Sequence, residues 1–144
     1  MKQDARCRLR WLLVPGLLCL AGCGSGDPFS YVRVSGKVTY EDGTPIPVEP
    51  LVLTFHPQDG QLDAKTYPKS GMAIARKDDG SFSEITSHKP GDGLVPGRHK
   101  VTLTDLDGRP LDARLVPPAY ADPATTPLEV DTAKAPFDLK VRKP

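Results

Sequence analysis

Cysteine is scarce in this sequence, and all of it lies at one end. The three cysteines, Cys7, Cys19 and Cys23, fall within the first 23 of 144 residues. Residues 24–144 therefore contain neither a free thiol nor a disulfide framework, which stabilises many small exported domains. This part of the chain must be held together by burial of apolar side chains alone, which is feasible for one domain of this size but not for two.

Long apolar runs and helical periodicity are also missing. The longest apolar run, residues 11–21, is about half as long as a membrane-spanning helix, and Pro15-Gly16 interrupts it. No segment after residue 23 repeats its apolar residues with a sustained helical period, and 16 prolines and 13 glycines are scattered through the chain. These absences argue against a transmembrane helix and a helical domain after residue 23, and they favour an all-β fold.

Patterns of residues typical of metal sites or of catalysis are sparse as well. The three histidines, His56, His88 and His99, are far apart in the sequence and form no pair at metal-ligand spacing. Residues 105–108, Asp-Leu-Asp-Gly, are more typical of a turn than of a calcium loop, because the remaining acidic positions and the closing Glu are missing. No nucleophile, base and orienting group can be proposed together, so we expect no enzymatic activity, no cofactor and no metal site.

The net charge gives no reason to expect a nucleic-acid partner. The chain has 19 basic and 18 acidic residues, a formal charge of +1. Residues 1–22 hold four of the basic residues and one of the acidic residues, which leaves residues 23–144 at −2. Domains that bind nucleic acid instead carry a basic patch or stripe.

The first 23 residues have the order of parts of an export signal. Four basic residues precede the apolar run, which has the length of a signal-peptide core. Residues 20–23, Leu-Ala-Gly-Cys, follow it and resemble the bacterial lipobox, in which small residues fit the protease cleft and the cysteine thiol takes a diacylglyceryl group. We therefore expect cleavage between Gly22 and Cys23 and lipidation of Cys23 with fatty acids such as palmitate.

Cleavage at that point divides the chain into three expected parts. Residues 1–22 are the lipoprotein signal peptide, residues 23–30 a flexible tether, and residues 31–144 the folded domain. Acyl chains anchor a protein by burying methylene groups at about 0.8 kcal/mol each, so two or three chains make release slow. The expected partner is thus a membrane of the cell envelope, and Gly24, in place of Asp, favours the outer membrane, on its periplasmic or surface face.

Residues 31–144 alternate between short apolar strands and turns rich in glycine and proline. The expected strands cover residues 31–40, 51–55, 71–76, 81–86, 98–104, 128–131 and 137–141. In the first strand, the apolar side chains that share one parity and should face the core are Val32, Val34, Val38 and Tyr40. The aromatic residues expected in the core are Phe55, Phe82 and Phe137. Asp78-Asp79-Gly80 predicts a hairpin, and the whole pattern predicts an antiparallel, seven-stranded, Greek-key-like sandwich.

Several turn-and-strand motifs, taken in order, resemble a known family. They are Val34-Ser35-Gly36-Lys37-Val38, Asp42-Gly43-Thr44-Pro45, Phe55-His56-Pro57, Asp79-Gly80-Ser81-Phe82 and Pro96-Gly97-Arg98-His99-Lys100-Val101. Their order and spacing resemble the carboxypeptidase regulatory-like domain, a transthyretin-like sandwich, over roughly residues 31–142. Residues 116–128 are similar to small lipoproteins of planctomycete-type bacteria, although Pro118-Ala119 stands where a Lys often precedes the Tyr. The resemblance implies a folding or adaptor module without catalytic residues of its own.

Two classes of function remain open. The first is a membrane-anchored, non-catalytic binding or structural module of the cell envelope, which contacts envelope proteins or polysaccharide through loops 57–70 and 105–127. The alternative is a carbohydrate-binding accessory domain of the cell surface, in which Tyr67 and Tyr120 stack on sugar rings. The single tryptophan, Trp11, lies in the expected signal peptide, which counts against this alternative. Fold alone cannot decide between the two.

A covalent link between strands is a further hypothesis. Lys37, Glu84 and Asp138 lie on the strands that carry an isopeptide bond in related adhesin sandwiches. Lys37 has the opposite parity to the apolar residues of its strand, so its side chain is expected to face solvent, which disfavours such a link.

Overall fold

The computed structural model describes residues 26–144. The expected signal peptide, the cleavage point between Gly22 and Cys23, and the lipidation site therefore lie outside the described residues. Residues 26–144 are all-β and form two sheets, one of three strands and one of four. Helical structure in this part is limited to two short 3-10 turns, η1 (Pro118–Ala121) and η2 (Thr132–Lys134), and none of it is long and apolar enough to cross a membrane.

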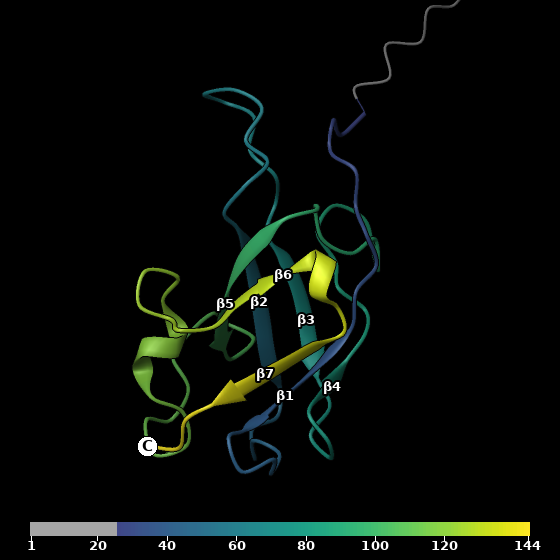
Figure 1. Ribbon diagram of the computed structural model, residues 1–144. Coiled ribbons are helices and arrows are strands. Elements are labelled where there is room, and N and C mark those ends of the chain that lie inside the picture. The colour runs from purple at the N-terminus through teal and green to yellow at the C-terminus, as the bar shows by residue number, and fades with distance from the viewer. Residues whose placement is uncertain (1–25) are drawn as a thin grey trace, which may run out of the picture.

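The two sheets lie one over the other, with β1 and β7 in front of β2 and β3 in Figure 1. The smaller sheet has the strand order β4-β1-β7, and the larger sheet has the order β3-β2-β5-β6. The strands are β1 (Gly36–Tyr40), β2 (Leu51–Pro57), β3 (Gly71–Ala75), β4 (Ser81–Phe82), β5 (Arg98–Thr104), β6 (Glu129–Asp131) and β7 (Phe137–Val141). The predicted all-β fold is confirmed for this part of the chain.

The position of a strand in its sheet explains its sequence. β2 lies inside the larger sheet, and its residues Leu51, Val52 and Leu53 are all buried. β3 lies at the edge of that sheet and alternates strictly, with small residues buried and with Met72 and Ile74 exposed. Successive side chains of a strand point to opposite faces, so β3 turns its small side chains to the core and two large apolar side chains to solvent.

Three phenylalanines join the two sheets. Phe55 comes from the larger sheet, and its ring centroid lies 5.8 Å from that of Phe82 and 6.1 Å from that of Phe137, which both come from the smaller sheet. All three side chains are buried, as predicted. Gly36 of β1 lies against this cluster, because a Cβ there would stand 2.7 Å from the Phe82 ring and 2.7 Å from the Phe137 carbonyl oxygen. The close packing of the rings therefore requires glycine at this position.

The expectation that all strands are antiparallel is wrong at one pair. β1 and β7 run parallel, with Gly36 beside Phe137 and Lys37 beside Asp138. The other four strand pairs are antiparallel. Parallel neighbours need a long connection, and here nearly the whole domain lies between the first and the last strand.

The hairpin predicted at Asp78-Asp79-Gly80 is also only partly correct. The turn forms, with Gly80 at φ 73° and its N–H donating to the Arg76 carbonyl oxygen over 2.7 Å. However, β3 pairs with β2 whereas β4 pairs with β1, so the chain crosses from one sheet to the other at this turn. The buried ring of Phe82 explains the crossing, because it packs between the sheets instead of beside β3.

The first strand is shorter than predicted. β1 begins at Gly36, and the residues before it make a single bridge, between Val32 and Leu94. Val34, Val38 and Tyr40 are buried as expected, but Val32 is 38% exposed. The chain before β1 thus leaves the sheet and lies against the loop that precedes Leu94.

Candidate functional site

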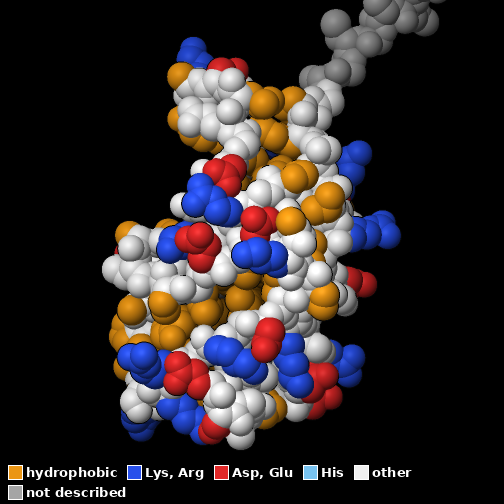
Figure 2. All heavy atoms as spheres, viewed as in Figure 1, with side chains coloured by type: hydrophobic (Ala, Val, Ile, Leu, Met, Phe, Trp, Pro, Cys, Tyr) orange, Lys and Arg blue, Asp and Glu red, His pale blue; other side chains and the backbone are white. Residues whose placement is uncertain are grey.

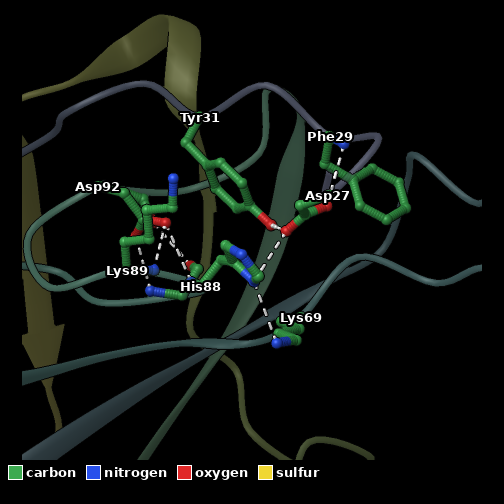
Figure 3. Close-up of polar contacts among 9 residues, drawn as sticks. Asp27, Phe29, Tyr31, Lys69, His88, Lys89 and Asp92 are labelled. Atoms are coloured by element: carbon green, nitrogen blue, oxygen red, sulfur yellow. Dashed lines mark hydrogen bonds and ion pairs between the residues drawn. The ribbon is translucent and has the colours of Figure 1, made fainter. Parts of the chain in front are cut away.

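The N-terminal segment is fixed to the domain by a polar group at one end of the sandwich (Figure 3). The Tyr31 hydroxyl donates to Asp27 Oδ2, and the Nδ1 atom of His88 lies 3.2 Å from the same oxygen. Lys69 Nζ lies 3.1 Å from His88 Nδ1. The rings of Tyr31 and His88 are stacked, with centroids 6.5 Å apart and an interplanar angle of 10°. These four residues, here called the junction cluster, bring together three segments that are distant in the sequence.

The pKa shifts of Asp27 and Tyr31 indicate a structural contact and not an acid–base pair. The hydrogen bond from Tyr31 is the main cause that holds the pKa of Asp27 below its usual value, and the Phe29 N–H and His88 act in the same direction. Burial of the Tyr31 hydroxyl raises its pKa, and the hydrogen bond to Asp27 raises it further. At neutral pH, Asp27 is therefore an ionised acceptor and Tyr31 a neutral donor, and neither is prepared to act as an acid or base.

The loop that carries His88 is ordered by one carboxylate. The two oxygens of Asp92 accept hydrogen bonds from the backbone N–H groups of Ser87, His88 and Lys89, at 2.9, 3.0 and 2.8 Å. Because these N–H groups already have a partner, they are not free to cradle a phosphate. The carboxylate instead fixes the position of His88 under Tyr31.

A groove of about 870 Å³ begins beside the junction cluster. It lies between edge strand β3 of the larger sheet and the chain around β4 of the smaller sheet. Ser70 and Ser87 line it near the junction, and Arg76 lines its far end. The exposed side chains of Met72 and Ile74, at 48% and 56%, also line it. The groove is therefore apolar along β3 and bordered by hydroxyl groups.

The outer edge of β3 has a gap in its hydrogen bonding at Ile74. Met72 exchanges two backbone hydrogen bonds with Thr86 over 2.8 and 2.9 Å, and the Arg76 N–H donates to Ser81 over 2.9 Å. In an antiparallel strand, alternate residues direct their N–H and C=O groups to the same side, so those of Ile74 also point away from β2. Within residues 26–144 no hydrogen-bond partner is found for them on that side. The gap is one residue long, because Thr86 and Ser81 of the same chain pair with Met72 and Arg76 on either side of it.

The three histidines occupy three separate environments. His56 Nε2 lies 2.9 Å from Thr102 Oγ1, and His88 belongs to the junction cluster. His99 is fully buried; its Nδ1 lies 3.2 Å from the Gly97 carbonyl oxygen, and its Nε2 has no hydrogen-bond partner in the described part of the chain. Residues 26–144 contain no group of three or more His, Cys, Asp or Glu side chains that could hold a metal ion.

The segment from 105 to 108 forms the turn that was predicted. The carboxylate of Asp105 accepts from the backbone N–H groups of Asp107 and Arg109, over 2.9 and 2.8 Å. Its Oδ1 atom accepts both of these hydrogen bonds and so closes the loop. Gly108 has φ 75°, a conformation that glycine adopts at low cost.

The two tyrosines expected to stack on sugars differ in exposure. Tyr67 is 59% exposed in loop 57–70, so that role remains a prediction. Tyr120 is 6% exposed, and its hydroxyl accepts from the Arg142 N–H over 3.0 Å, so the expectation for this residue is wrong. The reason is that the long segment 105–127 packs onto the domain, with Val116 also buried.

The proposed covalent pair is brought together but not buried. Lys37 and Asp138 lie side by side in the register of β1 and β7. Both are exposed, as is Glu84, and Asp138 forms an ion pair with Lys140 at 3.1 Å. The predicted outward direction of Lys37 is confirmed, and this surface lacks the burial that such a link would need.

Sequence patterns contain no sign of the junction cluster. Asp27 lies within the expected tether, and His88 follows it by 61 positions, so neither spacing nor periodicity connects the two. Comparison of the chain with family models, curated proteins and solved structures finds no significant match. The motifs that resemble the carboxypeptidase regulatory-like domain therefore support a proposal and not an assignment.

Proposed function

We propose that this chain is an exported bacterial lipoprotein, cut before Cys23 and acylated there. It carries a small non-catalytic β domain on a membrane of the cell envelope, the outer membrane in particular. The observation that carries the proposal is the tetrapeptide at residues 20–23, placed directly after a basic start and a short apolar run. The first described contact of the chain, at Asp27, follows only four residues after the expected lipid.

The domain itself is proposed to be a seven-stranded, Greek-key-like sandwich of the carboxypeptidase regulatory type. The turn motifs of the resemblance fit the backbone at two of their glycines. Gly43 and Gly80 follow aspartates and adopt φ 84° and 73°, and the aspartates Asp42 and Asp79 accept hydrogen bonds from residues two positions later. These turns have structural roles, which fits a scaffold without catalytic residues.

The groove beside β3 is proposed as the binding surface of this module. Its apolar wall at Met72 and Ile74 and the unpaired backbone groups of Ile74 suit an extended segment of another envelope protein, which would lie in the groove and bond to the backbone of Ile74. Backbone hydrogen bonds would supply affinity, and the two side chains would supply selectivity. An exposed apolar edge of this kind is otherwise a liability for a small domain.

Polysaccharide is the second candidate ligand, favoured by the hydroxyl groups along the groove. Ser35 and Ser83 are exposed there and make no side-chain hydrogen bond within residues 26–144. A sugar ligand would depend on side chains, whereas a bound peptide segment would depend on the Ile74 N–H. Ile74→Pro removes that donor at an edge position where proline is tolerated, and Ile74→Val keeps it. Binding to insoluble envelope polysaccharide that survives in both variants would favour the sugar ligand.

Membrane fractionation tests the anchor. In a host that processes lipoproteins, the wild type should remain in the membrane fraction after an alkaline wash. Cys23→Ser cannot be acylated at this position and should therefore lack the lipid anchor. Cys19→Ser is a matched control, because it changes a cysteine four positions away in the expected apolar core and should leave fractionation unchanged. Equal behaviour of all three chains would contradict the proposal.

A further inference from the structure

The junction cluster determines which end of the domain faces the point of lipid attachment. Asp27 is bonded to Tyr31 and to His88, so the chain is held to the domain from this residue onward. From Cys23 to Asp27 there are four residue steps, which span at most about 14 Å when fully extended. If Cys23 carries lipid, as proposed above, the end of the domain that bears the junction cluster must lie close to the membrane.

Loop 57–70 projects from that same end. It connects the end of β2 to the start of β3. Near its end it carries Lys69, whose Nζ atom contacts His88 in the junction cluster. In Figure 1 the loop extends beyond the sandwich on the side where the N-terminal segment lies, and in Figure 2 hydrophobic side chains gather on this projection. Its exposed apolar residues are Leu62 and Tyr67, each 59% exposed.

The loop is held in shape by its own aspartate. The Asp63 carboxylate accepts from the N–H groups of Lys65 and Thr66 over 2.7 and 2.8 Å, and the Leu62 N–H donates to the Thr66 carbonyl over 3.1 Å. Its tip is therefore a closed turn with the Asp63 charge directed inward. Leu62 and Tyr67 remain on the outside, although burying them against the domain would have removed apolar area from water.

Lysines at this end can reach the headgroups of an anionic surface. Asp59 is neutralised by Arg98 at 3.1 Å, whereas Asp63 and Asp92 accept hydrogen bonds from uncharged backbone N–H groups and keep their charge. Lys65 and Lys89 form no ion pair with any residue of the described part. An ammonium group in the same loop as an exposed Leu and Tyr, with a second one in the loop of His88, matches the chemistry of a bilayer interface, where aromatic rings and lysines lie at the headgroups.

We infer that loop 57–70 is a second membrane contact, which inserts Leu62 and Tyr67 into the interface of an anionic bilayer beside the lipid anchor. This inference rests on the proposed lipidation of Cys23. The two or three acyl chains of the anchor already make release slow, so the role of this second contact is to fix the orientation of the domain. The end of the groove at Ser70 and Ser87 then lies near the membrane surface.

Tryptophan fluorescence tests the contact, because the chain beyond Cys23 has no tryptophan of its own. The acylated chain is purified with Leu62→Trp, Tyr67→Trp or Leu106→Trp and reconstituted into vesicles that contain phosphatidylglycerol. Leu106 is a matched control, since it is 63% exposed and follows the opposite end of β5. The tryptophans introduced at positions 62 and 67 should emit at shorter wavelength than the one at position 106. They should also be quenched by lipids brominated on the acyl chains.

The charge contribution is tested in the same vesicles. Lys65→Gln should reduce quenching of the tryptophan introduced at position 67, and Lys77→Gln, beside the far end of β3, should not. Vesicles of phosphatidylcholine alone should abolish the difference between these two variants. Chains that float with the vesicles but show equally solvent-exposed emission at all three tryptophans would overturn the loop contact alone. Chains that do not float would overturn the lipid anchor and the inference with it.

Discussion

Val32 and Leu94 hold the N-terminal segment on the domain through a pair of backbone hydrogen bonds, 2.8 and 3.0 Å long. The bridge depends on the residue before Leu94. Gly93 has φ 102°, and a Cβ there would collide with the carbonyl oxygen of Val32. Only a residue without a side chain allows the two segments to approach this closely.

Gly93→Ala should therefore destabilise the domain more than Gly91→Ala. Both glycines have positive φ, at 102° and 68°, so alanine at either position is expected to cost about 1–3 kcal/mol of unfolding free energy from backbone strain. Gly93→Ala adds the collision with Val32, whereas a Cβ on Gly91 meets nothing within 4 Å. Urea unfolding of the two variants measures the difference. Equal midpoints would show that the bridge does not contribute.

Loss of the Asp27 carboxylate should release the segment before β1. Asp27→Asn weakens the contact with His88 and the bond from Tyr31, so amide hydrogens of residues 26–33 should exchange faster at pH 7 while those of β2 stay protected. Because the pKa of Asp27 is lowered from 3.8, its contribution is present above that value and is lost as the pH falls through the lower folded pKa. Unchanged exchange at neutral pH would contradict the role given to this cluster.

His99 should make the domain less stable in mild acid. Burial lowers its pKa from the ordinary 6.5, so the unfolded chain binds a proton more readily than the folded one. Stability should then fall as the pH drops below about 6.5, by at most about 1.4 kcal/mol per pH unit from this group. Gly97, Asp59 and Asp131 act to raise this pKa and His56 acts to lower it, and burial is the largest cause.

The variant His99→Leu isolates this effect. It removes the titrating ring and the unpartnered Nε2, while the Gly97 carbonyl keeps its bond from the Thr132 N–H. Stability curves from urea unfolding between pH 5 and pH 7 should be flatter for His99→Leu than for the wild type. Parallel curves would assign the acid sensitivity to other groups, such as His56, whose pKa is lowered by burial as well.

The ring of Phe82 should be among the main contributors to stability. Phe82→Ala leaves a cavity against Phe55 and should cost about 3–5 kcal/mol of unfolding free energy, a large part of the roughly 5–15 kcal/mol of a typical domain. Leu106→Ala, at a 63% exposed position, should change it by about 0.5 kcal/mol or less. Thermal unfolding of both variants tests this. A small loss for Phe82→Ala would mean that the two sheets are not joined through this ring.

The strands were predictable because their signals are local. Alternation of apolar residues placed β3, β5 and β7 almost to the residue, and turn residues such as Asp79-Gly80 and Pro96-Gly97 marked strand ends. Pairing was less predictable, because it depends on contacts between distant residues. No local signal could show that β1 lies parallel to β7, or that the turn before Phe82 leads into the other sheet.

The candidate site was missed for the same physical reason. A tyrosine and an aspartate of the N-terminal segment meet a histidine of a distant loop in the junction cluster only after the loop before Leu94 has folded. Tyr120 shows the opposite error, since its proline-rich surroundings suggested an exposed loop whereas its ring is buried. Composition indicates that a segment is irregular, but it does not show whether the segment packs on the domain.

The intact mass of the chain purified from membranes decides whether Cys23 is the lipid anchor. Wild-type protein from a lipoprotein-processing host should begin at Cys23 and carry the added mass of a diacylglyceryl group, with or without a third acyl chain. Cys23→Ala should lack all acyl mass. A wild-type chain that is unacylated, or that is cut at another position, would contradict the proposed anchor and leave an exported β domain without one.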